Sequence, residues 1–105
     1  MIKHYALSSE EMKQIRQKFG EHRYSSCPTW FDFFPWRKEK DDEGYAHSGH
    51  VIILKIDDGF QCLFYCRKTQ KGSEPERTAF YDFAAPTLDG VLVILQMLLD
   101  KHDMK

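Results

Sequence analysis

The sequence has no apolar run long enough to cross a membrane. Its longest apolar stretch, residues 91–95 followed by 97–99, is much shorter than the roughly 20 residues that span a bilayer. The N-terminal residues become charged almost at once and lack the apolar core of about 7 to 15 residues that a secretory signal needs. We therefore expect a cytoplasmic protein without membrane contact, in which the apolar run forms a core helix.

The chain also lacks an excess of charge of one sign and an even number of cysteines. Its 15 basic and 16 acidic side chains leave a formal net charge of -1, so no overall field attracts nucleic acid, and we expect no nucleic-acid partner. The three cysteines, Cys27, Cys62 and Cys66, are an odd set, and at least one would stay unpaired in an oxidising compartment. We expect three reduced and mostly buried thiols.

No recognised catalytic or phosphate-binding motif is present. The sequence contains neither a glycine-rich phosphate loop nor a G-x-S-x-G nucleophile elbow. The adjacent acidic pairs at 41–42 and 57–58 are typical of turns. A cysteine nucleophile could be drawn from Cys27, a histidine and Asp32, but nothing in the spacing fixes their geometry. We therefore predict a protein that is not an enzyme and needs no cofactor.

A metal site is the next possibility, because His47 and His50 precede a segment that contains Cys62 and Cys66. In an extended strand the two cysteines would lie about 13 Å apart, too far to share one ion. A site made of His47, His50 and Cys66 stays geometrically possible, but its spacing matches no recognised zinc pattern. We predict no metal and interpret the histidines as polar residues leading into a strand.

An N-terminal amphipathic helix is predicted over Ser9–Phe19. Ser8 and Glu11 have the spacing of a capping box, and Gly20 is placed to end the helix in the left-handed conformation. Three apolar residues form one narrow stripe: Met12, Ile15 and Phe19. The residues before it, 2–6, are predicted to form a short edge strand or an ordered arm.

The strongest local signal is a β-hairpin of residues 50–56 and 60–67, joined by an Asp-Gly turn. Both of its runs carry apolar residues on both faces, so we expect it to lie centrally with at least part of each face covered. A third strand is predicted over 77–83. A second helix is predicted from Thr87 or Leu88 to His102, and the breadth of its apolar surface indicates a core helix.

Together these elements predict one globular α+β domain over residues 1–105. Its mostly antiparallel sheet of three to five strands would follow the order α-β-β-β-α, with 29–34 as a further strand or a packed aromatic arm. The double-stranded-RNA-binding domain shares this order of elements. Such domains grip phosphates with a basic cluster at the start of the last helix, where this chain has Ala-Pro-Thr-Leu-Asp-Gly, so we interpret the likeness as shared topology alone.

An aromatic segment, residues 24–36, suggests how the protein acts. It holds six aromatic rings and two prolines in thirteen residues and follows neither helical nor strand periodicity. These rings either close the core or form an exposed surface beside the charged run 37–43. Under the second interpretation the protein is a stoichiometric inhibitor or neutralising protein, antitoxin-like, immunity-like or phage-type. Its partner, another protein, would contact five anchors: Tyr24, Trp30, Trp36, Arg37 and Tyr45.

Two other functions remain open. The first is a small-ligand-binding or enzymatic domain with a pocket between the aromatic segment and the sheet, using His47, His50 or Cys66 as polar groups. The second is a homo-oligomeric module, in which a homodimer forms through the C-terminal helix.

Overall fold

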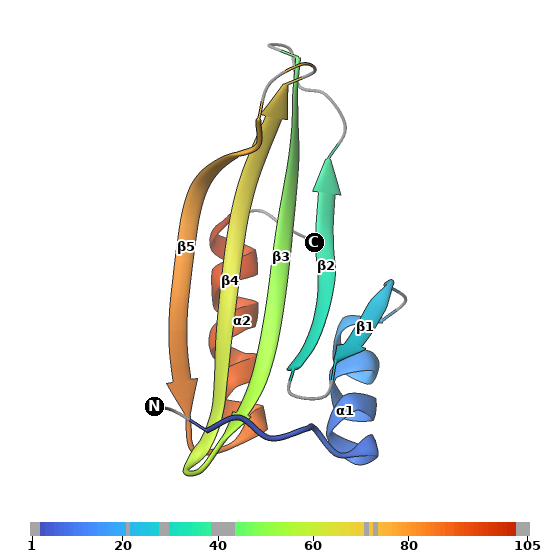
Figure 1. The fold of residues 1–105 in the computed structure, drawn as a ribbon, viewed down its shortest axis with the longest axis vertical. Coiled ribbons are helices and arrows are strands. Elements are labelled where there is room, and N and C mark those ends of the chain that lie inside the picture. The colour runs from blue at the N-terminus through green and yellow to red at the C-terminus, as the bar shows by residue number, and fades with distance from the viewer. Residues whose placement is uncertain are drawn as a thin grey trace.

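The computed structural model describes residues 3–20, 22–27, 30–38, 44–70, 72 and 74–102, and for residues 27 and 36–38 it describes the main chain only. These residues form two helices and five strands in the order α1-β1-β2-β3-β4-β5-α2 (Figure 1). The predicted α+β class and antiparallel sheet are confirmed, with five strands, the upper limit of the expected range.

Helix α1 spans Ser9–Phe19, as predicted. The capping box is complete, because the Glu11 amide donates to the Ser8 hydroxyl at 3.2 Å and the Ser8 amide donates to the Glu11 carboxylate at 2.7 Å. Gly20 follows the helix with a φ of 79° and donates its amide to the Arg16 carbonyl at 2.8 Å. Its ψ of -151° lies outside the left-handed helical region, so that detail of the prediction is wrong.

The sheet is a meander in which every strand pairs antiparallel with its neighbour in sequence. Its strands are β1 (Tyr24–Cys27), β2 (Trp30–Lys38), β3 (Tyr45–Ile56), β4 (Gly59–Gln70) and β5 (Glu76–Ala85). The predicted hairpin is β3 and β4, longer than expected and paired without a register shift from end to end. Two irregularities occur elsewhere, between Phe33 and Trp36 and between Cys66 and Arg67. At each of them one strand carries an extra residue.

The turn between β3 and β4 consists of Asp57 and Asp58, and Gly59 is already the first residue of β4. Gly59 has a φ of 150°, and a Cβ built there would lie 2.2 Å from the Ala85 carbonyl oxygen. The position therefore requires glycine. The N-terminal segment pairs with β3 through one isolated bridge, just beyond the first residue of β2. In this bridge the Tyr5 amide donates to the Lys55 carbonyl at 2.9 Å.

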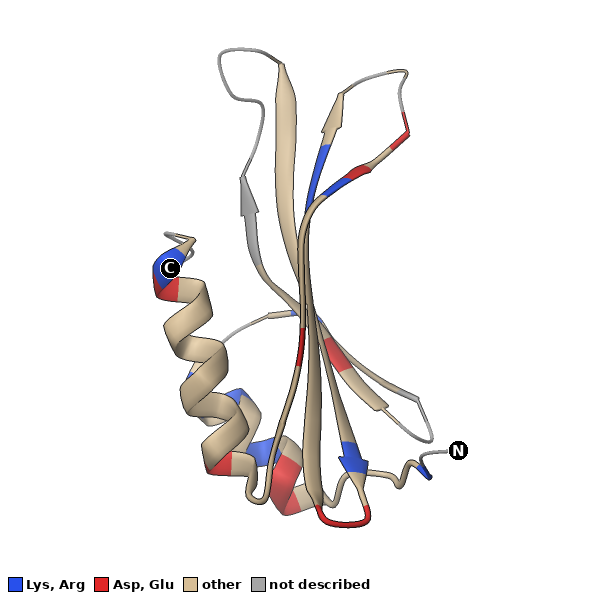
Figure 2. Ribbon diagram, turned by 90° about the vertical axis from the view of Figure 1, so that its left-hand side faces the viewer, with Lys and Arg blue, Asp and Glu red and all other residues tan. Residues whose placement is uncertain are grey.

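Helix α2 spans Leu88–Lys101 and begins at Thr87, whose hydroxyl accepts a hydrogen bond from the Gly90 amide at 3.1 Å. It lies along β4 and β5, on the same side of the sheet as α1 (Figure 2). Val93 and Met97 remain 54% and 65% exposed on its outer surface. Within the part of the chain that the structure describes, no helix is long and apolar enough to cross a membrane.

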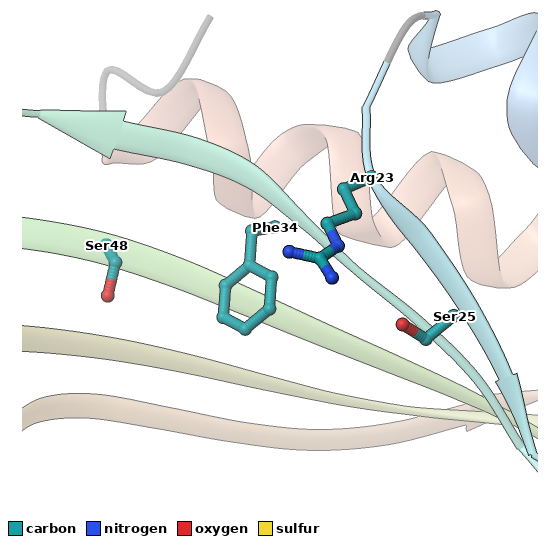
Figure 3. Close-up of a pocket in the computed structure, with 4 residues that line it drawn as sticks. All are labelled: Arg23, Ser25, Phe34 and Ser48. Carbon is teal, nitrogen blue, oxygen red and sulfur yellow. The ribbon is translucent and has the colours of Figure 1, made fainter.

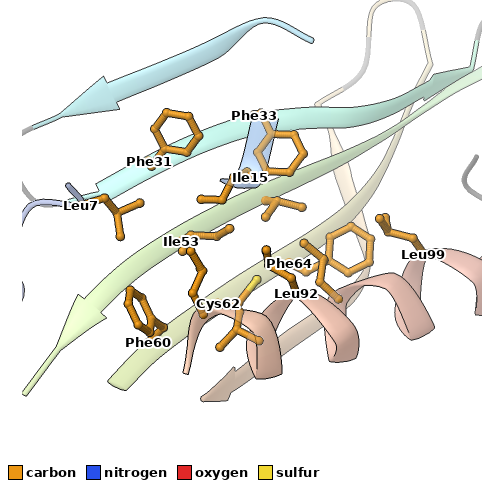
Figure 4. Packing of buried hydrophobic residues seen from close by; sticks show 14 of the residues in the cluster. Leu7, Ile15, Phe31, Phe33, Ile53, Phe60, Cys62, Phe64, Leu92 and Leu99 are labelled. Carbon is orange, nitrogen blue, oxygen red and sulfur yellow. The ribbon is translucent and has the colours of Figure 1, made fainter. Parts of the chain in front are cut away.

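One apolar cluster lies between the helices and the sheet (Figure 4). Ile15 of α1 and Leu95 of α2 are both fully buried in it. The sheet contributes a large set of inward-facing side chains: Phe31, Phe33, Val51, Ile53, Phe60, Cys62, Phe64 and Cys66. Both helices pack on this face, and Leu54 on the other face of the central hairpin is only 6% exposed, so part of each face is covered, as expected.

Candidate functional site on the uncovered face of the sheet

The face of the sheet that points away from the helices is called here the open face. Successive strand residues point to opposite sides, so the residues between the core positions of β2, β3 and β4 lie on it. The register aligns Asp32, Ile52, Leu63 and Asp82 in one row across four strands. No helix among the described residues covers this face (Figure 2).

Four rings form a second row across the open face. Phe34 stacks on His50 with ring centroids 4.3 Å apart and planes within 10° of parallel. His50 in turn lies 6.1 Å from Tyr65, and Tyr65 lies 4.8 Å from Phe80. The two terminal rings stay accessible, with Phe34 50% and Phe80 44% exposed. This ring row is a continuous aromatic surface that crosses β2, β3, β4 and β5.

Beneath Phe34, the imidazole of His50 holds a carboxylate. Its Nε2 donates to Oδ2 of Asp32 at 2.8 Å, and both side chains are less than a fifth exposed. The other carboxylate oxygen, Oδ1, is buried and has no hydrogen-bond partner among the described residues. The pair therefore joins β2 to β3 and leaves one acceptor unsatisfied under the ring row.

A third row carries arginine. The register places Arg37 opposite Ser48, Ser48 opposite Arg67, and Arg67 opposite Arg77. The guanidinium groups of Arg67 and Arg77 lie on the ring row. Their central carbon atoms are 5.5 Å and 5.1 Å, respectively, from the centroid of the Tyr65 ring, and that of Arg77 is also 5.2 Å from the centroid of the Phe80 ring. Both arginine residues are exposed while their guanidinium groups lie near the stacked rings.

A pocket of about 360 Å³ opens at the β1 side of the open face. It is lined by Arg23, Ser25, Phe34 and Ser48, and Figure 3 shows the guanidinium group of Arg23 beside the Phe34 ring. A stacking surface, a cation and two hydroxyl groups could together hold a planar anionic group.

Three of the five residues predicted as anchors have described side chains, and these three lie in different parts of the sheet. Tyr24 belongs to the helix side, where its ring stacks on Phe31 at 5.4 Å and its hydroxyl donates to the Gly20 carbonyl at 2.7 Å. Tyr45, the first residue of β3, is half-buried, and the Lys68 ammonium lies 4.8 Å from the centroid of its ring. Trp30, at the start of β2, is 42% exposed.

The remaining two anchors, Trp36 and Arg37, have described main chains only. Trp36 is paired with Gly49, and Arg37 occupies the position in the arginine row given above. Their side chains lie outside the described residues, as do most of the charged run and residues 28–29 of the aromatic segment.

The histidines and the cysteine considered for a metal site do not converge. His50 lies on the open face, whereas Cys66 is buried in the core on the opposite face. His47 is paired with Lys68, and within the described chain no group of three or more potential ligands is close enough to hold a metal ion. Burial raises the pKa of the Cys66 thiol, and burial together with the Asp82 carboxylate raises that of Cys62, so both stay protonated and unreactive.

Sequence reasoning missed the ring row, the Asp32–His50 pair and the paired arginines. The sequence carries a signal for the central part of the ring row, because a two-residue turn at Asp57 and Asp58 aligns His50 with Tyr65. The pairing of Tyr65 with Phe80 depends on the longer β4–β5 connection and on the irregularity beside Arg67. Local patterns do not determine that register.

Comparisons of the chain with protein-family models, with curated proteins and with solved structures found no match.

Proposed function

We propose that this chain is a stoichiometric protein-binding module, an inhibitor or neutralising protein of the antitoxin or immunity type, that binds its partner with the open face. The observation that carries the proposal is the set of exposed rings on the uncovered sheet, Trp30, Phe34 and Phe80. Large accessible aromatic side chains interleaved with arginine are typical of interaction surfaces, where a partner removes them from water.

The proposed role requires no catalytic group, since complementarity alone would block a target. It fits a cytoplasmic site of action, because Cys62 and Cys66 are free thiols, as expected in a reducing compartment. The anchor set changes accordingly: Trp30 is kept, and Phe34, Tyr65 and Phe80 are added. Tyr24 is removed, because its ring is partly buried against the core on the helix side.

The test is a parallel capture from a lysate of the source cells with three baits: the wild-type protein, Phe80→Ala and Met97→Ala. Phe80 lies on the open face and Met97 on the outer surface of α2, and both are exposed apolar side chains, so the two substitutions are matched. We expect one stoichiometric partner that the wild type and Met97→Ala retain and Phe80→Ala loses.

The captured partner is then purified, and its binary affinity is measured by calorimetry with each variant after circular dichroism has shown that the variant is folded. Equal affinity for Phe80→Ala and the wild type would refute the assignment of the binding face.

Two observations favour the other functions. The pocket lined by Arg23 and Phe34 suits a small anionic ligand, which would raise the melting temperature on binding. The exposed Val93 and Met97 suit a homodimer through α2, which would show as a molecular mass that rises with concentration and falls in Met97→Ala.

A further inference from the structure

The arginine row is an unusual arrangement for an antiparallel sheet. Arg67 and Arg77 are directly opposite each other, and like charges in that position destabilise strand pairing. Each guanidinium carbon is within 5.5 Å of the same Tyr65 centroid, so the two cations share one aromatic support. Both arginines are exposed in the same part of the open face, and guanidinium N–H donors bind carboxylate or phosphate oxygens in pairs.

Acceptors within the described chain do not use these donors. The two acidic residues on the open face are already engaged, Asp32 by His50 at 2.8 Å and Asp82 by the Gln61 amide at 2.8 Å. Among the described residues, neither Arg67 nor Arg77 has an ion pair or hydrogen bond, and Arg23 beside the pocket has none either. Apart from the buried Oδ1 of Asp32, the unpaired charged groups of the open face among the described residues are therefore the arginine donors.

Lysine is used differently. Lys55 pairs with Glu11 of α1 at 3.1 Å, and Lys68 pairs with Glu76 at 3.7 Å, so the lysines of β3 and β4 have carboxylate partners. In the part of the chain that the structure describes, the open face carries arginine and aromatic rings but no lysine, which is the composition of a protein interface. A nucleic-acid track would instead need a continuous basic stripe, and here apolar Ile52 and Leu63 occupy the middle of the face.

We infer that the partner of the open face is a protein surface that presents carboxylates to Arg67 and Arg77 and lays apolar side chains on the ring row. This inference rests on the proposed function and adds the chemistry of the partner to it. The charge pairs would speed association and fix orientation, while the rings would supply the buried area.

The test needs no identified partner. Arginine Nε–Hε signals of the ¹⁵N-labelled protein are followed by NMR during titration with pentaglutamate, with pentalysine and with the oligonucleotide pentathymidylate. We expect pentaglutamate to shift the Arg67 and Arg77 signals and to leave the Arg16 signal, which lies against Tyr24 on the helix side, in place. Pentalysine should shift none of them. The pentaglutamate shifts should disappear as the salt concentration rises from about 50 to about 500 mM.

Variants sharpen the assignment. Arg67→Gln with Arg77→Gln should weaken pentaglutamate binding by at least about tenfold. Lys68→Gln removes one positive charge from the same strand on the helix side, so it should change that affinity less than about twofold. Unshifted arginine signals with pentaglutamate would overturn the inference, as would pentathymidylate binding as tightly as pentaglutamate or more tightly, because the latter result assigns the face to nucleic acid.

The two proposals can fail separately. A captured partner that is lost by Phe80→Ala but bound unchanged by the double arginine variant leaves the binding face in place and refutes its acidic partner. A partner bound equally by Phe80→Ala and the wild type refutes the binding face itself, whatever pentaglutamate does.

Discussion

Replacing His50 with phenylalanine isolates the role of the Asp32–His50 pair. The new ring keeps the stacking with Phe34 and Tyr65 but removes the donor that Asp32 accepts from at 2.8 Å. Asp32 is only 18% exposed and already has one unpartnered oxygen, so its carboxylate would lose its hydrogen bond without gaining full hydration. Leaving such a group unpaired costs about 1–3 kcal/mol. We expect the melting temperature to fall by roughly 4 °C for each kcal/mol in a chain of this size.

The measurement is urea unfolding followed by circular dichroism, with the free energy of unfolding compared at constant m-value. Combining His50→Phe with Asp32→Leu removes both polar groups and should restore stability to within about 1 kcal/mol of the wild type. Ser48→Ala, on the same strand, should change it by less than about 0.5 kcal/mol. The reasoning is refuted if His50→Phe alone is as stable as the wild type, or if the double variant loses the sum of both single losses.

Three further predictions concern the frame that holds the open face. Gly59→Ala should lower the free energy of unfolding, measured in urea, by more than about 2 kcal/mol, because the new Cβ would lie 2.2 Å from the Ala85 carbonyl oxygen. A decrease below about 0.5 kcal/mol would contradict the turn geometry. Burial raises the pKa of Glu11, but hydrogen bonds from Ser8 and Lys55 outweigh it, so the folded-state pKa lies below the ordinary value of 4.5. The stability this adds is present above about pH 4.5 and lost as the pH falls through the lower folded-state pKa, so acid unfolding of Glu11→Gln should show a smaller pH dependence than the wild type. Cys62 and Cys66 should resist iodoacetamide at pH 8 in the folded protein and react after unfolding, as read by peptide mass spectrometry; equal labelling in both states would contradict their burial.

Elements with local chemical signals could be predicted from the sequence. The capping box at Ser8 and Glu11 predicted the start of α1, and the Asp-Asp-Gly segment predicted the central hairpin, although the turn is Asp57–Asp58 and not the expected Asp-Gly pair. Thr87 set the start of α2. Each of these signals acts within a few residues, so no knowledge of the remaining chain was needed.

The strands before the hairpin could be predicted only in part, for a physical reason. The irregularity between Phe33 and Trp36 shifts the alternation of β2, so its aromatic residues match no single period. The open face was harder still to predict. Ile52 and Leu63 are as apolar as the buried residues beside them in β3 and β4, and His50 alone does not reveal which face is uncovered. Which side of a strand is covered depends on where both helices dock, and that information lies in tertiary packing.

The meander topology also constrains how the chain can fold. Every strand of the sheet pairs with a strand next to it in sequence, so no pairing has to wait for a distant segment to arrive. The β3–β4 hairpin closes over two turn residues, and β2 and β5 can then each add to an exposed edge of an existing ribbon. This topology favours fast folding for a protein dominated by β-sheet, because folding rates fall as contacts span longer stretches of chain. Assembly can proceed outward from the centre, and the helices at the two ends of the chain need only dock on a surface that is already formed.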